Sequence, residues 1–241
     1  MSGRPSSPAD RKHDGNPMAD RVIRVLLVDD HAMVRRGMRD FLDLHDDIEV
    51  VGEAVDGAEA VERAAGLRPD VVVMDLMMPN LDGIEATGRI KSEAPDVEVI
   101  ALTSFIEEAR VIAAIEAGAS GFLLKDAEAD ELAEAIRAAA AGEVHLDPAI
   151  AGIVARRMRD GGRANGRAAG ERNGIDALTA RERDVLAKVA RGLPNRQIAD
   201  DLGITERTAR THVSNILAKL GLASRTQAAL LAVQHGLDRE A

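Results

Sequence analysis

The sequence predicts a doubly wound α/β domain with a five-stranded parallel sheet, followed by a separate all-α domain of four helices. Five short apolar runs alternate with helical patterns up to residue 141, whereas only helical patterns occur after residue 176. Continuous apolar runs are typical of parallel strands that are buried on both faces. Five consecutive strand–helix units therefore indicate one sheet with helices on both sides.

The runs that predict strands are Val22–Val28, Ile48–Val55, Val71–Met74, Val97–Leu102 and Gly121–Leu124. Apolar residues recur at helical spacing after each run, as in Val34, Met38 and Phe41 after the first. Leu132 and Ile136 show the same spacing after the last run. This spacing places the apolar side chains on one face of each helix, where they can cover the sheet.

Two polar segments divide the chain. Residues 1–20 are rich in Pro, Ser, Gly and Asp and lack an apolar core, which predicts a disordered extension and not a signal peptide. A helical stretch after Asp147 is expected to run to about Met158, and residues 160–174 hold five glycines and no large apolar residue. Such a composition cannot offset chain entropy by burial, so we expect a flexible linker. The expected units are an extension (1–20), a first domain (21–146), a linker helix with its linker (147–175) and a second domain (176–241).

Capping residues outline the second domain. Thr179 followed by Glu182 is a capping-box pattern that starts its first helix, and Gly192–Pro194 ends that helix. The next helices are expected over about Arg196–Asp201, from a Thr205 cap to near Gly221, and from a Ser224 cap to about Gln234. Gly203 turns the chain between two of them, and two helices around a tight Gly-containing turn match a helix-turn-helix.

The net charge of −10 is unevenly distributed. Residues 21–146 carry 12 Lys and Arg against 27 Asp and Glu, whereas residues 176–241 carry 10 against 8, a net +2. This segregation predicts one acidic module and one near-neutral module. The absence of cysteine excludes disulfides and thiolate metal sites and fits a cytoplasmic location. No stretch approaches the ~20 apolar residues of a membrane span, and the near absence of aromatic residues argues against a stacking platform for single strands.

Five polar residues stand at the carboxyl ends of the predicted strands, where doubly wound sheets bind ligands. They are Asp29, Asp30, Asp75, Thr103 and Lys125. Three carboxylates in one cleft repel one another unless a cation lies among them, and oxygen ligands of this kind suit Mg²⁺. An aspartate beside Mg²⁺ can attack a phosphoryl donor, while Lys125 and Thr103 contact the phosphoryl oxygens. Singly, each residue would be an ordinary turn or surface residue; together they predict a phosphoryl-transfer site.

These positions lie in longer motifs, namely Val28–Asp30, Val73–Pro79, Leu81–Gly83, Leu102–Ser104 and Gly121–Asp126. In these motifs residues 22–141 resemble a response-regulator receiver domain, which has a flavodoxin-like fold, and the full chain resembles the NarL/FixJ family with its LuxR-type output domain. The resemblance implies that Asp75 accepts the phosphoryl group. It implies a Mg²⁺ site formed by Asp30, Asp75 and the backbone carbonyl of Met77, with Asp29 acting mainly through water.

The resemblance also implies a switch and a partner. Thr103 would reorient toward the phosphate, and Phe122 would turn inward behind it. A sensor histidine kinase would supply the phosphoryl group, or a small phosphodonor in its place, so the protein is expected not to be an enzyme in its own right. Met77 and Phe105 are apolar and cannot orient an attacking water, so we expect only slow autodephosphorylation.

The second domain carries the motifs of a LuxR-type output domain in Leu178–Glu182, Gly192–Asn195, Gln197–Ala199, Leu202–Thr205, Lys219–Leu220 and Arg225–Ala229. The helix after the Thr205 cap has an apolar stripe and an opposite polar face. Arg207, Thr211 and Ser214 lie on that polar face, and Arg210 lies at the edge of the apolar stripe. Such a face can enter a major groove, where Arg suits guanine edges. The resemblance assigns base reading to Arg210, Thr211 and Ser214, so double-stranded promoter DNA is the expected partner; because Ala209, Arg210 and Ser214 depart from common family residues, the operator sequence is not predicted.

The last helix is apolar enough to form both a core and a dimer face, with Ala228, Leu231 and Ala232 as candidates for the dimer face. The resemblance favours a homodimer that forms on phosphorylation and binds paired half-sites. A domain with a net charge of +2 makes few phosphate contacts and binds loosely. Two linked modules gain affinity through their effective concentration.

Two other functions fit parts of the sequence. The first is a phosphorylation-regulated protein-interaction module that does not act through DNA, and retention of promoter DNA would separate it from a transcription factor. The second is a Mg²⁺-dependent phosphohydrolase, because haloacid dehalogenase-like enzymes also use an aspartate nucleophile on an α/β sheet. Those enzymes need a second acid two residues after the nucleophile, where this chain has Met77.

Overall fold

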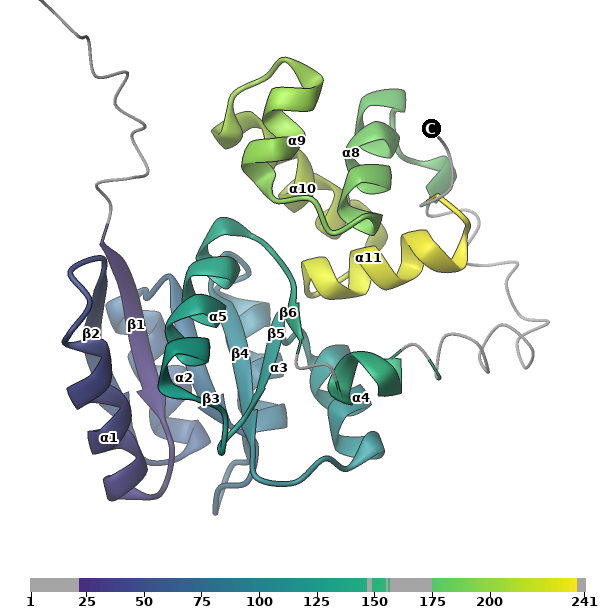
Figure 1. Cartoon of the computed structure of the whole chain (residues 1–241). Helices are drawn as coiled ribbons and strands as arrows, with labels where there is room; N and C mark the ends of the chain where they lie inside the picture. The colour runs from purple at the N-terminus through teal and green to yellow at the C-terminus, as the bar shows by residue number, and fades with distance from the viewer. Residues whose placement is uncertain (1–21, 147–148, 155, 157–174, 238–241) are drawn as a thin grey trace, which may run out of the picture.

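The computed structural model describes residues 22–146, 149–154, 156 and 175–237. It contains a parallel sheet flanked by helices and a separate bundle of four helices (Figure 1). The strands are β1 (Ile23–Val28), β2 (Ile48–Ala54), β3 (Val71–Asp75), β4 (Glu98–Thr103), β5 (Gly121–Leu124) and β6 (His145–Leu146). The helices around the sheet are α1 (Ala32–Leu42), α2 (Gly57–Leu67), α3 (Gly83–Glu93), α4 (Glu108–Ala117) and α5 (Ala129–Ala141). The bundle consists of α8 (Ala180–Ala190), α9 (Asn195–Leu202), α10 (Glu206–Leu220) and α11 (Arg225–Gln234).

The strand order is β2-β1-β3-β4-β5-β6, and every pair is parallel. The five predicted strands are confirmed, with ends that differ by at most one residue. The sixth strand was not predicted, because its two residues are too few to form an apolar run. The order of strands reverses at β1, which lies between β2 and β3, so the carboxyl ends of β1 and β3 border the crevice where such sheets bind ligands.

The central strands bury both faces. In β1, Val25 and Leu27 belong to a cluster with residues of α1 and α5, whereas Leu26 and Val28 belong to a cluster with residues of α2 and α3. Successive side chains of a strand point to opposite faces, and helices cover both faces here. Because both faces of these strands are buried, their sequences are continuous apolar runs and do not alternate between apolar and polar residues.

A third apolar cluster surrounds α4. It joins Leu76, directly after β3, to Val111 and Ile115 of α4 and to Phe122 of β5. Helical residues 149–154 add three further side chains to it, Ile150, Ile153 and Val154. These residues are the described part of the predicted linker helix. Met158, the linker over 160–174 and the extension over 1–20 lie outside the described residues.

The caps predicted for the second domain are confirmed. Thr179 and Glu182 form a reciprocal capping box at the start of α8, and the side chains of Thr205 and Ser224 cap α10 and α11. Gly203 ends α9 at φ +64°, in the left-handed region that favours glycine. Among the described residues no single helix is long and apolar enough to cross a membrane; α10 and α11 pass that test only as a pair bent by 69°.

Candidate functional site

The carboxyl ends of β1 and β3 bring three acidic side chains together. Asp29 follows β1 and is fully buried, Asp75 is the last residue of β3 and is also buried, and the side chain of Asp30 is partly exposed. One ligand atom from each of Asp29, Asp30, Asp75 and His31 lies within 4.8 Å of the others. The predicted convergence of the three carboxylates is therefore present in the structure.

Lys125, directly after β5, supplies the positive charge of this pocket. Its Nζ lies 2.6 Å from Oδ2 of Asp29 and 2.7 Å from Oδ2 of Asp75. Burial raises the pKa of Asp75, and hydrogen bonds from Lys125 and from the N–H of Met77 only partly offset this effect. Burial by itself would lower the pKa of Lys125, but its close contacts with both carboxylates outweigh burial and raise the pKa. One ammonium group does not balance three clustered carboxylates, so the pocket fits an additional divalent cation with oxygen ligands.

The two predicted switch residues lie on neighbouring strands. Thr103 ends β4, and its hydroxyl donates to the carbonyl of Phe105 at 2.8 Å and accepts from the N–H of Phe105 at 3.3 Å. The hydroxyl is thus engaged with its own loop. Phe122 is completely buried in the cluster around α4. Movement of either side chain on phosphorylation stays a prediction.

Sequence reasoning missed one residue that contacts this pocket, His31, and one that contacts the loop after β3, Arg110. His31, at the start of α1, donates its backbone N–H to Asp29 at 2.8 Å, and its Nδ1 lies 2.6 Å from Asp30. Arg110 of α4 donates from Nη2 to the carbonyl of Leu76 at 2.8 Å. His31 directly follows the aspartate pair, and Arg110 is the one basic residue of α4. Both positions can be read from the sequence, but neither residue belongs to a periodic apolar pattern or to a recognised motif.

The four residues predicted to contact DNA share one surface of α10. Arg207, Thr211 and Ser214 are exposed, Arg210 is about half exposed, and all four line a cleft between the two domains. The Nη2 atom of Arg210 donates to the carbonyl of Ala140 in α5 at 3.3 Å. The predicted recognition face therefore lies against the first domain in this structure.

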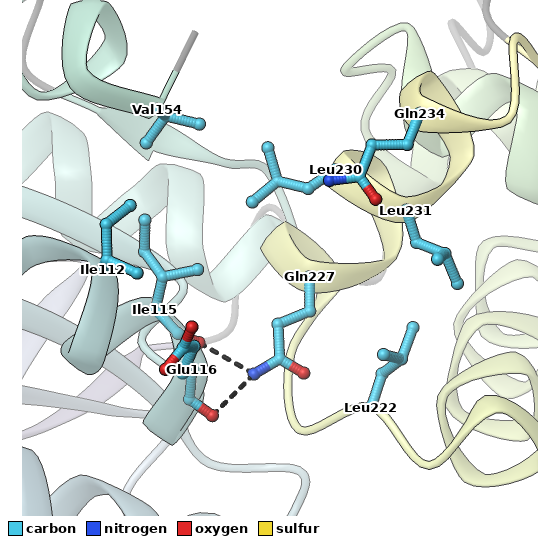
Figure 2. Close-up of a pocket in the computed structure, with 9 residues that line it drawn as sticks. All are labelled: Ile112, Ile115, Glu116, Val154, Leu222, Gln227, Leu230, Leu231 and Gln234. Atoms are coloured by element: carbon cyan, nitrogen blue, oxygen red, sulfur yellow. Dashed lines mark hydrogen bonds between the residues drawn. The ribbon is translucent and has the colours of Figure 1, made fainter. Parts of the chain in front are cut away.

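The second domain satisfies carbonyl groups at the ends of two helices of the first domain. The Nε2 atom of Gln227 donates to the carbonyls of Ile115 and Glu116 in α4, at 2.8 and 2.9 Å (Figure 2). The Nδ2 atom of Asn195 donates to the carbonyl of Ala141 in α5 at 3.2 Å. Carbonyls in the last turn of a helix lack intrahelical donors. The carbonyl of Ile115 also accepts from the N–H of Gly118 at 3.0 Å, so Gln227 shares this acceptor with the end of α4.

The candidate dimer residues lie in and beside this interdomain contact. Ala228 and Ala232 are buried in the core of the second domain. Leu231 is partly buried and lines an apolar pocket of about 250 Å³ between α4, residue 154 and α11 (Figure 2). In this arrangement Ala228 and Ala232 are not accessible to a second copy, and their role in a dimer stays a prediction.

Family comparisons agree with both halves of the molecule. The sequence-family model described as "Response regulator receiver domain" matches residues 25–137. The sequence-family model described as "Bacterial regulatory proteins, luxR family" matches residues 176–232. An acidic pocket at the strand ends of a doubly wound sheet, joined to a helix-turn-helix bundle, defines a two-component regulator of transcription. The chain belongs to the response regulators with a LuxR-type DNA-binding output domain.

The transcriptional regulatory protein LiaR of Bacillus subtilis is 47% identical over 218 residues, which cover 90% of this chain and 99% of that relative. The response regulator protein VraR of Staphylococcus aureus is 42% identical over 216 residues, with 90% and 99% covered. A solved two-component response regulator of the LuxR family from Aurantimonas has a TM-score of 0.54 and 38% identity, covering 57% of this chain and 99% of that one. The RcsB response regulator of Salmonella typhimurium has a TM-score of 0.51 and 25% identity, covering 90% and 99%.

Proposed function

We propose that phosphorylation of Asp75 by a sensor histidine kinase, in the presence of Mg²⁺, switches this regulator between a closed form and a promoter-binding form. The observation that carries this proposal is the buried carboxylate of Asp75, which lies beside Asp29 and Asp30 and 2.7 Å from Lys125. This arrangement suits an aspartyl phosphate, because the nucleophile lies beside a cationic side chain and among carboxylates that would hold a divalent cation.

The proposed transfer uses residues of this pocket throughout. A carboxylate oxygen of Asp75 attacks the phosphorus of a phosphohistidine; the new P–O bond forms as the P–N bond breaks, and the imidazole leaves with the electron pair. Asp30, Asp75 and the Met77 carbonyl would hold Mg²⁺, which would supply charge neutralisation at the phosphoryl oxygens. Lys125 stays within reach of the product and pairs with a phosphoryl oxygen. The Thr103 hydroxyl then exchanges the Phe105 carbonyl for a phosphoryl oxygen.

Exposed apolar residues around the pocket support docking of a kinase. Met33 on α1 is 88% exposed, Met77 after β3 is 54% exposed, and Phe105 after β4 is 80% exposed. All three lie at the carboxyl edge of the sheet, where a partner must dock to reach a buried carboxylate. Exposed apolar side chains that gather at one edge can form an interaction site, and these three belong to the segments that follow β1, β3 and β4.

The closed arrangement is proposed as the resting form. The cleft that holds the predicted recognition face is lined on the receiver side by six acidic residues, among them Asp96, Glu98 and Glu143, and by two arginines, Arg68 and Arg137. A duplex would have to occupy the position of this acidic wall, and Arg210 is already engaged with the receiver. Phosphorylation would stabilise an open form. The shift can be no larger than the difference between the free energies with which the phosphoryl group interacts with the open and the closed form.

Release of the output domain also bears on assembly and location. Separation of α11 from α4 would expose Leu230 and Leu231, which line the pocket between them. We propose that α11 then contributes to a homodimer that binds paired half-sites, in the cytoplasm, where promoters and kinase domains meet. RcsB, a similar protein, has been described for its conformational dynamism for DNA interaction, and this supports movement of the same kind here.

Genome-wide DNA occupancy with wild type and Asp75→Ala tests the proposal. The wild type should gain promoter occupancy when its kinase is active, and Asp75→Ala should not. Equal, stimulus-dependent gains in both proteins would contradict control through Asp75. Failure of both to retain promoter DNA would favour the interaction module that does not act through DNA.

A further inference from the structure

Arg110 holds both ends of the loop that follows the phosphoacceptor strand. Its Nη2 donates to the carbonyl of Leu76 at 2.8 Å and lies 3.8 Å from Oδ2 of Asp82. Asp82 begins the next helix, because its Oδ1 accepts from the N–H groups of Ile84 and Glu85 at 3.0 and 2.9 Å. The guanidinium group thus links the first and last residues of the segment 76–82, which contains Met77.

The contact is more specific than a surface ion pair. Arg110 is only 29% exposed, and its Nη2 binds a backbone carbonyl directly beside Asp75. Its Nε is buried and, among the described residues, has no hydrogen-bond partner. A buried donor without a partner is costly, so stability alone does not account for this placement.

The other end of α4 contacts the output domain. Gln227 donates to the carbonyls of Ile115 and Glu116, and Leu230 packs against the apolar cluster that contains Leu76 (Figure 2). Arg110 and Ile115 are five residues apart, about 7.5 Å along a helix axis at 1.5 Å per residue. One short helix therefore contacts the phosphoacceptor loop at one end and the recognition domain at the other.

We propose that Arg110 is a positioning residue that couples the state of the loop over residues 76–82 to α4, and through α4 to the docking of α11. Arg110 contacts none of the reacting atoms. It therefore affects how the domains respond once Asp75 is phosphorylated, and not the transfer of the phosphoryl group to Asp75. This inference rests on the proposed function, because it assigns the route by which phosphorylation of Asp75 opens the molecule.

The test measures domain opening and phosphorylation in the same samples. The chain has no cysteine, so Glu62→Cys and Arg191→Cys, both at exposed positions, give one labelling site in each domain of the full chain. Energy transfer between the labels reports the ratio of open to closed protein before and after acetyl phosphate with Mg²⁺. Phosphate-affinity gels report the fraction phosphorylated. The variants are R110M, which keeps the apolar stem but no donor, and R110K, which restores a cationic donor.

Arg89→Met is the matched control, because Arg89 is an exposed arginine of α3 whose ion pair is with Glu85 on its own helix. We expect R110M to be phosphorylated like wild type, while the opening caused by phosphorylation falls about tenfold or more, as for the loss of one charged hydrogen bond. R110K should recover most of this coupling, and R89M should behave as wild type.

Wild-type opening by fully phosphorylated R110M would overturn the assignment. Failure of R110M to take up phosphate, with normal uptake by R110K, would also overturn it, since Arg110 would then serve assembly of the pocket. Should R110M not fold, R110A replaces it with the same readouts. If the phosphorylated wild type itself does not open, the proposed switch fails, independently of Arg110.

Discussion

Replacement of Gln227 by Glu tests the closed form with a minimal change. The amide nitrogen of Gln227 donates to the carbonyls of Ile115 and Glu116, while its Oε1 accepts from the N–H of Ala223 at 2.8 Å. A glutamate is isosteric and keeps the acceptor for Ala223. It removes both donors and places a carboxylate oxygen against two carbonyls at the end of α4. The change therefore acts on the interdomain contact and creates no cavity in the output domain.

The magnitude follows from these two hydrogen bonds. Each neutral hydrogen bond contributes about 0.5–1.5 kcal/mol net, so their loss weakens the closed form by about 1–3 kcal/mol. That range corresponds to a shift of roughly 5- to 150-fold toward the open form. The negative charge at the carboxyl end of a helix adds repulsion in the same direction. Thr226 still donates to the carbonyl of Ser120 at 3.1 Å, so the domains keep part of their contact.

Energy transfer between the two labels of the unphosphorylated protein measures this shift, and promoter affinity gives a second readout. Gln234→Glu is the matched control: Gln234 lies on the same helix and lines the same pocket, and within the described residues it donates no hydrogen bond to the receiver (Figure 2). Gln227→Glu should be partly open without phosphate, and Gln234→Glu should be closed. If both variants stay as closed as wild type, the contacts of α11 with α4 do not hold the resting form.

Three further predictions concern individual residues. The hydrogen bond from Lys219 lowers the pKa of Glu182 from 4.5 to about 2, so this carboxylate should stabilise the output domain above pH 4.5 and lose that contribution as the pH falls toward 2. The difference in thermal stability between wild type and Glu182→Gln should shrink over that range, and a constant difference would contradict the role of the charge. Met77→Asn should shorten the lifetime of the phosphorylated protein several-fold because an amide can orient water; loss of the wild-type phosphate within seconds would contradict slow autodephosphorylation. Arg210→Ala should cost about 1–3 kcal/mol in operator affinity and relax specificity at one position, whereas an equal loss on all sequences would indicate a phosphate contact only.

Much of the receiver pocket followed from the sequence because strand ends can be located from apolar runs. Asp75 and Thr103 are the last residues of β3 and β4, and Lys125 directly follows β5. Since parallel strands end at one edge of a sheet, knowing where each strand stops was enough to bring these side chains together. The caps of the output helices were predictable for a similar reason, because a cap is a local interaction between residues three apart.

Contacts between elements far apart in the chain were not predictable. Arg110, Gln227 and Asn195 each donate to a backbone carbonyl of a distant segment, and carbonyl acceptors leave no mark in a sequence. The placement of the predicted recognition face against α5 depends on how the two domains dock. Periodicity describes each domain by itself and carries no information about that docking.

Reaction of the full chain with acetyl phosphate and Mg²⁺, followed by mass spectrometry of the modified peptide, tests the central claim most directly. We expect a single hydroxylamine-labile phosphoryl group on Asp75, dependent on Mg²⁺ and absent from Asp75→Asn. A modification at another residue, or none on the wild type under conditions in which the protein is folded, would contradict the account of how this regulator is switched.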